Sequence, residues 1–436
     1  MKLFKNTNWL ISERVISLFG GLLSNIYIAR ILGPEEFGKL NYLVATVILL
    51  QPLMKLGLHS IITRELCEHP TKHSEIIKTT FSIRMCTSIL TFFGAIVSLY
   101  LIGFLENEMV LLFTILMIGQ LFSPFEVYNY WFECNVNAKP VTISRTLSTL
   151  SFAVTKIIIV YLYKSLTALV IIVSIEFIMG YLVVYFCFKK YNVNSLQVAT
   201  TKTSWKYALK LVKQSYWLVF SALAAAIYMK IDQVMLGYIL TKSDVAIYSV
   251  AVKFSEMAYF IPVAIVTSLF PSIIKSKNED SVLSYHNKLK FVMGGLFWLA
   301  FIGAVICTFI SEKLITITYG DQYLESALLL NIHIWASLFV FVRALLSKWI
   351  LTEKLYKFSL YTQGVGALTN IVLNTMWIPT YGAVGAAWAT LFSVAMSSWL
   401  SLFLANKTRH MGYLMTVSPI YFIVKCLKNV VLTRIK

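Results

Sequence analysis

Charged side chains stand inside segments of this sequence that are otherwise apolar, and they are the residues best suited to chemistry. A charge at the centre of a bilayer costs about 3 kcal/mol, so a chain that keeps several of them usually lines a watery cavity with them. Five are acidic: Glu13, Glu126, Glu176, Asp232 and Glu256. Eight are basic: Arg14, Lys55, Arg84, Lys156, Lys230, Lys253, Arg343 and Lys348.

The excess of basic over acidic residues favours an anionic ligand. Arginine can hold phosphate oxygens with two parallel N–H donors, and lysine supplies a compact positive charge. The structural alternative is an ion pair, as between Arg14 and Glu13, or a side chain that reaches back to the membrane surface. We predict a binding site for a phosphate-bearing lipid that is built from Arg14, Lys55, Arg84, Lys253, Arg343 and Lys348.

Four of the acidic residues are candidates for coupling to an ion gradient: Asp232, Glu256, Glu126 and Glu176. A carboxylate inside the membrane can change its protonation or bind Na⁺. The sequence has no GxxxxGK[ST] loop to bind a nucleotide, so we expect H⁺ or Na⁺ to supply the energy. The structural alternative is a buried acid that pairs with one of the eight bases.

The histidines and cysteines indicate neither a catalytic centre nor a metal centre. His69 and His73 are four residues apart in a polar segment, without a third ligand nearby. The six cysteines are scattered, and none forms a CxxC pair. We predict a protein that is not an enzyme, with no catalytic residues, no metal, no cofactor and no disulfide framework.

The elements that carry these charges are predicted to be transmembrane helices. The chain is 58% hydrophobic and only 13% charged, whereas about a quarter of a soluble chain is charged. A helix of about 20 apolar residues spans the hydrocarbon core. Hydropathy predicts twelve such helices, near 9–30, 40–62, 80–104, 109–132, 142–163, 166–188, 211–239, 245–272, 291–311, 326–351, 358–379 and 383–405.

The distribution of lysine and arginine predicts the orientation of these helices. The N-terminus, every second connection and the C-terminal tail together carry 25 basic residues, Arg145 among them, while the remaining connections carry five. Because cytoplasmic loops are enriched in lysine and arginine, both termini are predicted to be cytoplasmic. The net charge of +18 is explained by this bias and by attraction to anionic headgroups, so we expect no nucleic-acid partner.

The helices are predicted to form two six-helix halves around a central cavity. The halves are residues 1–190 and 211–405, joined by a basic cytoplasmic linker at 191–210 and followed by a cytoplasmic or interfacial tail at 406–436. An offset of 208 residues aligns Trp9-Leu10 with Trp217-Leu218, and the turn Glu35-Glu36-Phe37 with Ser243-Asp244-Val245. Repeats of this kind bind substrate between the halves. In the tail, the apolar stretch 413–424 is too short to span and contains Pro419, which favours an interfacial helix.

Four segments spread along the chain carry a resemblance to a known family: 29–38 (ARILGPEEFG), 230–237 (KIDQVMLG), 246–249 (AIYS) and 379–387 (PTYGAVGAA). They are similar to the first loop, the helix 7–8 region and the helix 11–12 turn of O-antigen (Wzx-type) polysaccharide flippases. These flippases belong to the multidrug/oligosaccharidyl-lipid/polysaccharide exporter superfamily. Ala246 departs from the pattern, where glycine is expected, and the turn after Lys164 lacks the glycines of its counterpart in the second half.

The resemblance implies an activity. Such a flippase carries an undecaprenyl-pyrophosphate-linked oligosaccharide, used for O-antigen and lipopolysaccharide biosynthesis, from the cytoplasmic to the periplasmic leaflet of the bacterial inner membrane by alternating access. Membrane lipids, and polymerase and chain-length proteins, would be its partners. A multidrug or amphiphile antiporter of the same fold is an alternative, but it would favour an acidic, aromatic cavity. A membrane glycosyltransferase would bring a large loop with catalytic acids, yet residues 189–213 contain no Asp or Glu.

Overall fold

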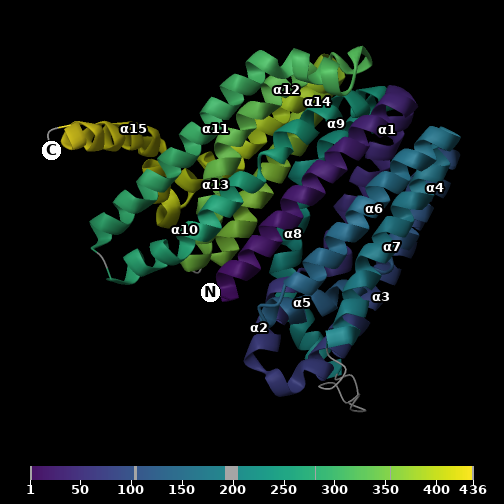
Figure 1. Cartoon of the computed structure of the whole chain (residues 1–436), viewed down its shortest axis with the longest axis horizontal. Helices are drawn as coiled ribbons and strands as arrows, with labels where there is room; N and C mark the ends of the chain where they lie inside the picture. Colours follow the sequence, from purple (N-terminus) through teal and green to yellow (C-terminus); the bar gives the residue numbers. More distant parts are fainter. Residues whose placement is uncertain (1, 103–105, 192–204, 280, 354, 435–436) are drawn as a thin grey trace. The chain divides into compact units, whose positions relative to one another are not determined.

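The computed structural model describes residues 2–102, 106–191, 205–279, 281–353 and 355–434, and this part of the chain is helical, without β-strands. The helices are α1 (Lys2–Lys55), α2 (His59–Glu68), α3 (His73–Ile102), α4 (Asn107–Gln120), α5 (Val127–Cys134), α6 (Lys139–Tyr163), α7 (Leu166–Tyr191), α8 (Trp205–Ile239), α9 (Lys242–Met257), α10 (Phe260–Glu279), α11 (Val282–Thr318), α12 (Ser326–His333), α13 (Ser337–Thr352), α14 (Tyr356–Ser398) and α15 (Asn406–Arg434). Short 3₁₀ turns connect some of them: η1 (Pro70–Lys72), η2 (Ser123–Glu126), η3 (Asp321–Tyr323), η4 (Ile334–Ala336) and η5 (Leu400–Leu404) (Figure 1).

Ten helical stretches of the described residues are long and apolar enough to cross a membrane. The stretch Trp9–Glu68 contains two of the predicted spans, and Lys357–Ser398 contains the span 358–379 and most of the span 383–405. The remaining eight stretches correspond to the other eight predicted spans. The predicted all-α, multi-pass membrane fold is confirmed.

A glycine turn divides each of the two long stretches. Gly33 in α1 and Gly382 in α14 have φ angles of 77° and 60°, a left-handed conformation that glycine adopts without strain. A Cβ added at Gly385 would lie 2.4 Å from the carbonyl oxygen of Trp377, although residues eight apart in a straight helix are about 12 Å apart along its axis. The two arms of α14 therefore fold back on each other after Trp377.

Five of the predicted spans are interrupted in the structure, where hydropathy predicted continuous helices. Two are interrupted near their ends, where residues 56–58 separate α1 from α2 and where η5 follows α14. The other three are interrupted further inside. Turn η2 separates α4 from α5, residues 258–259 separate α9 from α10, and η4 separates α12 from α13. Proline explains two of these breaks, because Pro124 lies in η2 and Pro262 lies in the first turn of α10. The third break has no proline, and nothing in its sequence marks it.

The chain forms two compact units. Unit 1 comprises Met1–Ala226 and Thr241–Ala246, and unit 2 comprises Ile227–Leu240 and Ile247–Lys436. The division falls inside α8 and again inside α9. Most of the predicted linker at 191–210 lies outside the described residues.

In unit 1, the two turns that the 208-residue offset aligns lie against each other. The Ser243 hydroxyl donates to a Glu35 carboxylate oxygen over 3.1 Å, and the Lys242 ammonium lies 4.5 Å from the centre of the Tyr42 ring. A Cβ added at Gly38 would lie only 1.7 Å from the Lys242 carbonyl oxygen. Glycine at position 38 therefore permits this close contact between the turns.

The expectation of no disulfide was wrong for one pair of cysteines. Cys67 of α2 and Cys134 at the end of α5 form a disulfide, with their Cα atoms 5.4 Å apart. The pair has no local sequence signal because it is 67 residues apart and meets only where α2 packs against α5.

Candidate functional site

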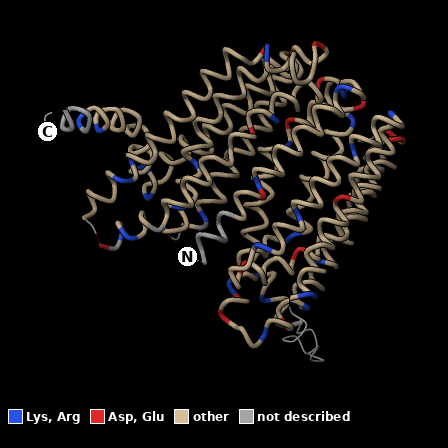
Figure 2. Tube along the Cα trace, viewed as in Figure 1, with Lys and Arg blue, Asp and Glu red and all other residues tan. Residues whose placement is uncertain are grey.

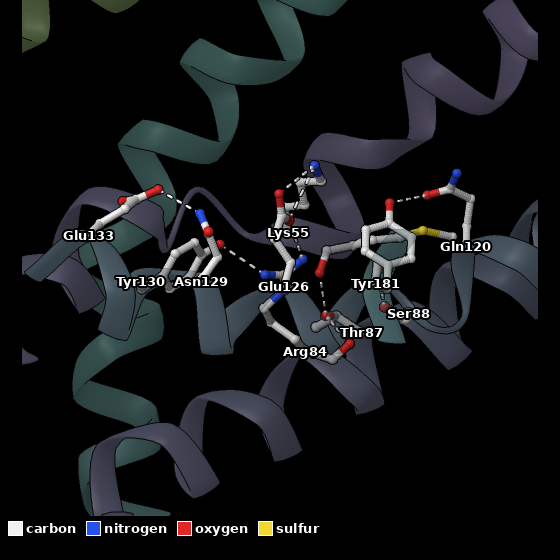
Figure 3. Close-up of polar contacts among 12 residues, drawn as sticks. Lys55, Arg84, Thr87, Ser88, Gln120, Glu126, Asn129, Tyr130, Glu133 and Tyr181 are labelled. Carbon is white, nitrogen blue, oxygen red and sulfur yellow. Dashed lines mark hydrogen bonds and ion pairs between the residues drawn. The ribbon is translucent and has the colours of Figure 1, made fainter. Parts of the chain in front are cut away.

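Glu126 brings two of the predicted basic residues together in unit 1 (Figure 3). The Arg84 guanidinium donates to one Glu126 oxygen over 3.1 Å and to the Tyr130 hydroxyl over 2.8 Å. The Lys55 ammonium lies 3.3 Å and 3.4 Å from the two Glu126 oxygens. One carboxylate is therefore shared between two cations.

Three helices and one turn position this cluster. Lys55 lies in the last turn of α1, Arg84 lies on α3, and Glu126 ends the η2 turn that breaks the fourth predicted span. The Thr87 hydroxyl donates to the Met54 carbonyl over 3.1 Å and so fixes α3 against the end of α1. Because η2 interrupts the helix, α5 starts beside the cluster and supplies Tyr130.

Burial gives the two cations different roles. The Arg84 side chain is fully buried, whereas the side chain of Lys55 is 34% exposed. Two positive charges meet one negative charge, so the cluster keeps an excess positive charge on its accessible side, at Lys55. The Arg84 Nε is buried and has no hydrogen-bond partner among the described residues.

Two cavities of unit 1 share Glu126. The first has a volume of about 340 Å³ and includes Gln51, Lys55, His59, Glu126 and Tyr130 in its lining. The second has a volume of about 300 Å³ and is lined by Glu13, Glu126, Arg145, Ser148, Thr149, Glu176, Phe177, Gly180 and Tyr181. The first thus combines basic and aromatic groups, while carboxylates and hydroxyls dominate the second.

Arg145 is a cavity residue that was counted with a cytoplasmic connection, although it falls at the start of the predicted span 142–163. Helix α6 starts at Lys139, three residues before the predicted span, so Arg145 lies in its second turn. Pro140 in the first turn was the available signal, because proline is favoured at helix starts.

Two of the predicted coupling acids form simple ion pairs. Lys156 lies 2.9 Å from Glu176 in unit 1, and Lys230 lies 3.2 Å from Glu256 in unit 2. Together with Glu126, three of the four candidate acids therefore contact lysine or arginine. This geometry agrees with the alternative to ion coupling, in which a buried acid pairs with one of the eight bases.

Asp232 differs, because the partners of its carboxylate are uncharged. It is 2% exposed in unit 2. It accepts hydrogen bonds from the Tyr248 hydroxyl over 2.8 Å, from the Asn374 amide and from the Thr390 hydroxyl. The Asn374 amide also lies 3.1 Å from the Asn370 carbonyl oxygen. The Asn374 carbonyl oxygen is buried without a donor among the described residues.

The remaining predicted residues have separate surroundings. Arg14 is exposed on α1, and Lys253 is half-buried on α9. Arg343 is buried on α13 and donates to the Ser397 carbonyl over 2.6 Å and to the Thr362 hydroxyl over 3.3 Å. The Lys348 ammonium lies 5.5 Å from the centre of the Phe270 ring. That all the predicted basic residues line one cavity remains a prediction.

Fold and site together define a multi-pass helical membrane protein with polar, charged clusters within its membrane-spanning helices (Figure 2). Residues 3–277 match the family described as polysaccharide biosynthesis protein. The chain therefore belongs to this family, and the resemblance to polysaccharide flippases is confirmed.

The relatives are distant in sequence. A probable low-salt glycan biosynthesis flippase of Haloferax volcanii is 22% identical over 50% of this chain, and the match spans about half of that relative, 48% of its length. A putative O-antigen transporter of Shigella flexneri is 24% identical over 76% of this chain and 80% of its own length. In fold, the chain is similar to the lipid II flippase MurJ in an inward closed conformation, with a TM-score of 0.71, 14% identity, and coverage of 98% of this chain and 93% of that structure.

Proposed function

We propose that this protein is a flippase that moves an undecaprenyl-pyrophosphate-linked oligosaccharide from the cytoplasmic to the periplasmic leaflet of the bacterial inner membrane by alternating access. Membership of the polysaccharide biosynthesis family and the flippase relatives support this class of substrate. A sugar headgroup cannot cross hydrocarbon unaided, because each unsatisfied polar group there costs several kcal/mol, about 2–7 on transfer scales. The protein must therefore supply polar and cationic partners inside the membrane.

The single observation that carries the proposal is the excess positive charge at Glu126. Arg84 and Lys55 share one carboxylate, and only Lys55 is accessible from the 340 Å³ cavity. A phosphate oxygen at the Lys55 ammonium would balance the second charge. In this arrangement Lys55 contacts the pyrophosphate, while Arg84 is a positioning residue that holds Glu126.

The 300 Å³ cavity on the other side of Glu126 suits sugar hydroxyls. Its carboxylates accept hydrogen bonds, while Arg145, Ser148 and Thr149 can donate them. In unit 1, a headgroup could therefore place its phosphate at Lys55 and its first sugar toward Arg145.

The carboxylates of this second cavity also favour the other candidate, an antiporter of amphiphilic cations. Glu13, Glu126 and Glu176 all line it. Two of these acids are already paired with basic residues, Glu176 with Lys156 and Glu126 with Lys55 and Arg84. A cationic ligand would have to displace those bases, whereas a neutral sugar would not.

Asp232 is the proposed coupling residue, where H⁺ or Na⁺ would bind. A buried carboxylate surrounded by neutral donors lacks the charge compensation that its three counterparts have. A proton or a small cation would supply it. The unpartnered Asn374 oxygen and the nearby Asn370 oxygen could join Asp232 as oxygen ligands of Na⁺.

A deletion strain tests the flippase proposal. We expect deletion to accumulate the complete lipid-linked repeat unit on the cytoplasmic face of the inner membrane and to abolish surface polysaccharide, with both effects reversed by the wild-type gene. Accumulation of a shortened repeat unit would instead indicate a sugar-transferring enzyme. An unchanged lipid-linked pool with increased drug sensitivity would support the antiporter.

A further inference from the structure

Helix α15 has two opposite apolar faces, and only one of them is covered by protein. Met411, Met415 and Ser418 are buried on the covered face, and Phe422 on the same face contacts the α11 glycines. The opposite face exposes a stripe of large apolar side chains spaced four, three, four and three residues apart: Tyr413, Val417, Ile420, Val424 and Leu427. This spacing keeps all five on one side of a helix.

Helix α15 crosses α11 where α11 changes from polar to apolar. A Cβ added at Gly294 would lie 2.3 Å from the Ser418 carbonyl oxygen, and the Trp298 indole donates to the Pro419 carbonyl over 3.0 Å. Just before this crossing, α11 carries Lys288 and Lys290, and the predicted span starts at residue 291. The crossing therefore lies at the level where α11 enters the hydrocarbon.

Cations flank the exposed stripe, and no acid does. Residues 406–436 contain six lysines and arginines and neither Asp nor Glu, and Figure 2 shows blue but no red along α15. The Lys425 ammonium lies 4.9 Å from the centre of the Phe291 ring and 5.8 Å from that of Tyr421, so it sits at the edge between the covered face and the stripe. Lys428 is exposed on the same side of the helix.

The start of α15 borders a further cationic hollow. A cavity of about 610 Å³ lies between the start of α14 and the start of α15, and its lining includes Lys357 and Lys407 together with Leu355, Phe358 and Tyr361. A lining that combines cationic and apolar side chains suits an amphiphile with an anionic head. Cations therefore stand near both ends of the stripe, Lys407 and Arg409 at the start of α15 and Lys425 and Lys428 beyond its middle.

We propose that α15 is an anionic-phospholipid-binding helix that lies in the headgroup layer of the leaflet predicted to be cytoplasmic. The Tyr413–Leu427 stripe contacts acyl chains, while Lys407, Lys425 and Lys428 contact phosphates. An amphipathic helix with a cationic polar edge binds in this way, and basic residues near the surface strengthen its attraction to anionic lipids. Figure 1 shows α15 extending past α11, away from the other helices of unit 2. The proposal concerns lipid contact alone and does not depend on the transported substrate.

Photo-crosslinking of the full-length protein tests this proposal. Ile420, at the centre of the stripe, is replaced by p-benzoylphenylalanine, and the protein is reconstituted in equal amounts of phosphatidylglycerol and phosphatidylcholine. We expect phospholipid adducts, with several-fold more phosphatidylglycerol than phosphatidylcholine. The same probe at Met415 is the matched control, and we expect it to crosslink within the chain, to α11. A dimer band or no lipid adduct from position 420 would overturn the proposal.

The variant Lys425→Gln with Lys428→Gln tests the role of charge separately. Lys428 is exposed and Lys425 lies at the edge of the packed face, so the protein should still fold, which its gel-filtration profile checks. We expect lipid adducts from position 420 to persist while the preference for phosphatidylglycerol falls toward parity. An unchanged preference would contradict the assignment of these lysines to phosphate.

Discussion

The Arg84 guanidinium, fully buried in unit 1, donates a 3.1 Å hydrogen bond to Glu126. This contact predicts that neutralising Glu126 alone destabilises the protein more than neutralising Glu126 and Arg84 together. Glu126→Gln leaves Arg84 buried without a carboxylate, and breaking a buried pair in this way costs about 3–5 kcal/mol. We expect Glu126→Gln to lower the unfolding temperature of the purified protein in detergent, measured by tryptophan fluorescence.

The double variant Arg84→Gln with Glu126→Gln is the control for this prediction. It removes both charges, so most of the lost stability should return, although transport should not. If the double variant is as unstable as the sum of the two single variants, the two side chains do not act as a pair.

The uncharged surroundings of Asp232 predict that its substitution changes the ion dependence of transport. Substitution of Glu256 should not change it. In reconstituted vesicles, we expect Asp232→Asn to make transport insensitive to ΔpH or to a Na⁺ gradient while the protein stays folded. Glu256→Gln removes the partner of Lys230, so we expect it to lower stability and leave the gradient dependence in place. Equal gradient dependence in Asp232→Asn and the wild type would remove the coupling role.

The close packing around Gly38 predicts that a larger side chain at this position destabilises the protein. Gly38→Ala would place a Cβ 1.7 Å from the Lys242 carbonyl oxygen, while no atom lies within 4 Å of a Cβ added at Gly21. We expect Gly38→Ala to destabilise the protein by at least about 1–3 kcal/mol, as overpacking does. Gly21→Ala should have little effect. Comparing the amounts of folded monomer of both variants by fluorescence-detected gel filtration checks the difference, and equal amounts would refute the contact.

The positive-inside pattern predicts the orientation. Alkaline phosphatase fused after Lys202 or after Asn278 should be inactive, because both positions are predicted to be cytoplasmic. The same enzyme fused after Asp321 should be active in the periplasm. Activity after Lys202 would overturn the orientation, since the basic segment around it carries much of the bias.

The spans could be predicted from the sequence, but their breaks could not all be predicted. Apolar length is a local property, so hydropathy located the membrane helices. The η4 break has no proline, and η4 packs against α11 and α14, which are distant from it in sequence. The glycine turns at Gly33 and Gly382 were both placed between predicted spans, because Gly-Pro and Tyr-Gly stand at the ends of apolar runs.

The residues of the candidate site could be predicted from the sequence better than the contacts between them. Charge in an apolar run identified Lys55, Arg84, Glu126 and Asp232 without a structure. That Arg84 and Lys55 share Glu126 depends on the packing of α1, α3 and η2, which no local pattern reveals. The uncharged partners of Asp232 were missed, although Asn370 and Asn374 stand four residues apart in an apolar helix, and this spacing was an available signal.

Flipping of a lipid-linked oligosaccharide by the purified protein tests the central claim most directly. The protein is reconstituted in vesicles with a fluorescent undecaprenyl-pyrophosphate oligosaccharide, and a membrane-impermeant quencher reports the fraction in the outer leaflet. We expect transfer between leaflets with the wild type, much slower transfer with Lys55→Gln at an unchanged unfolding temperature, and substantial recovery with Lys55→Arg. Lys275→Gln, at an exposed position, is the control and should match the wild type. No transfer by folded wild-type protein in the presence of either gradient, or equal rates for Lys55→Gln and the wild type, would contradict the account.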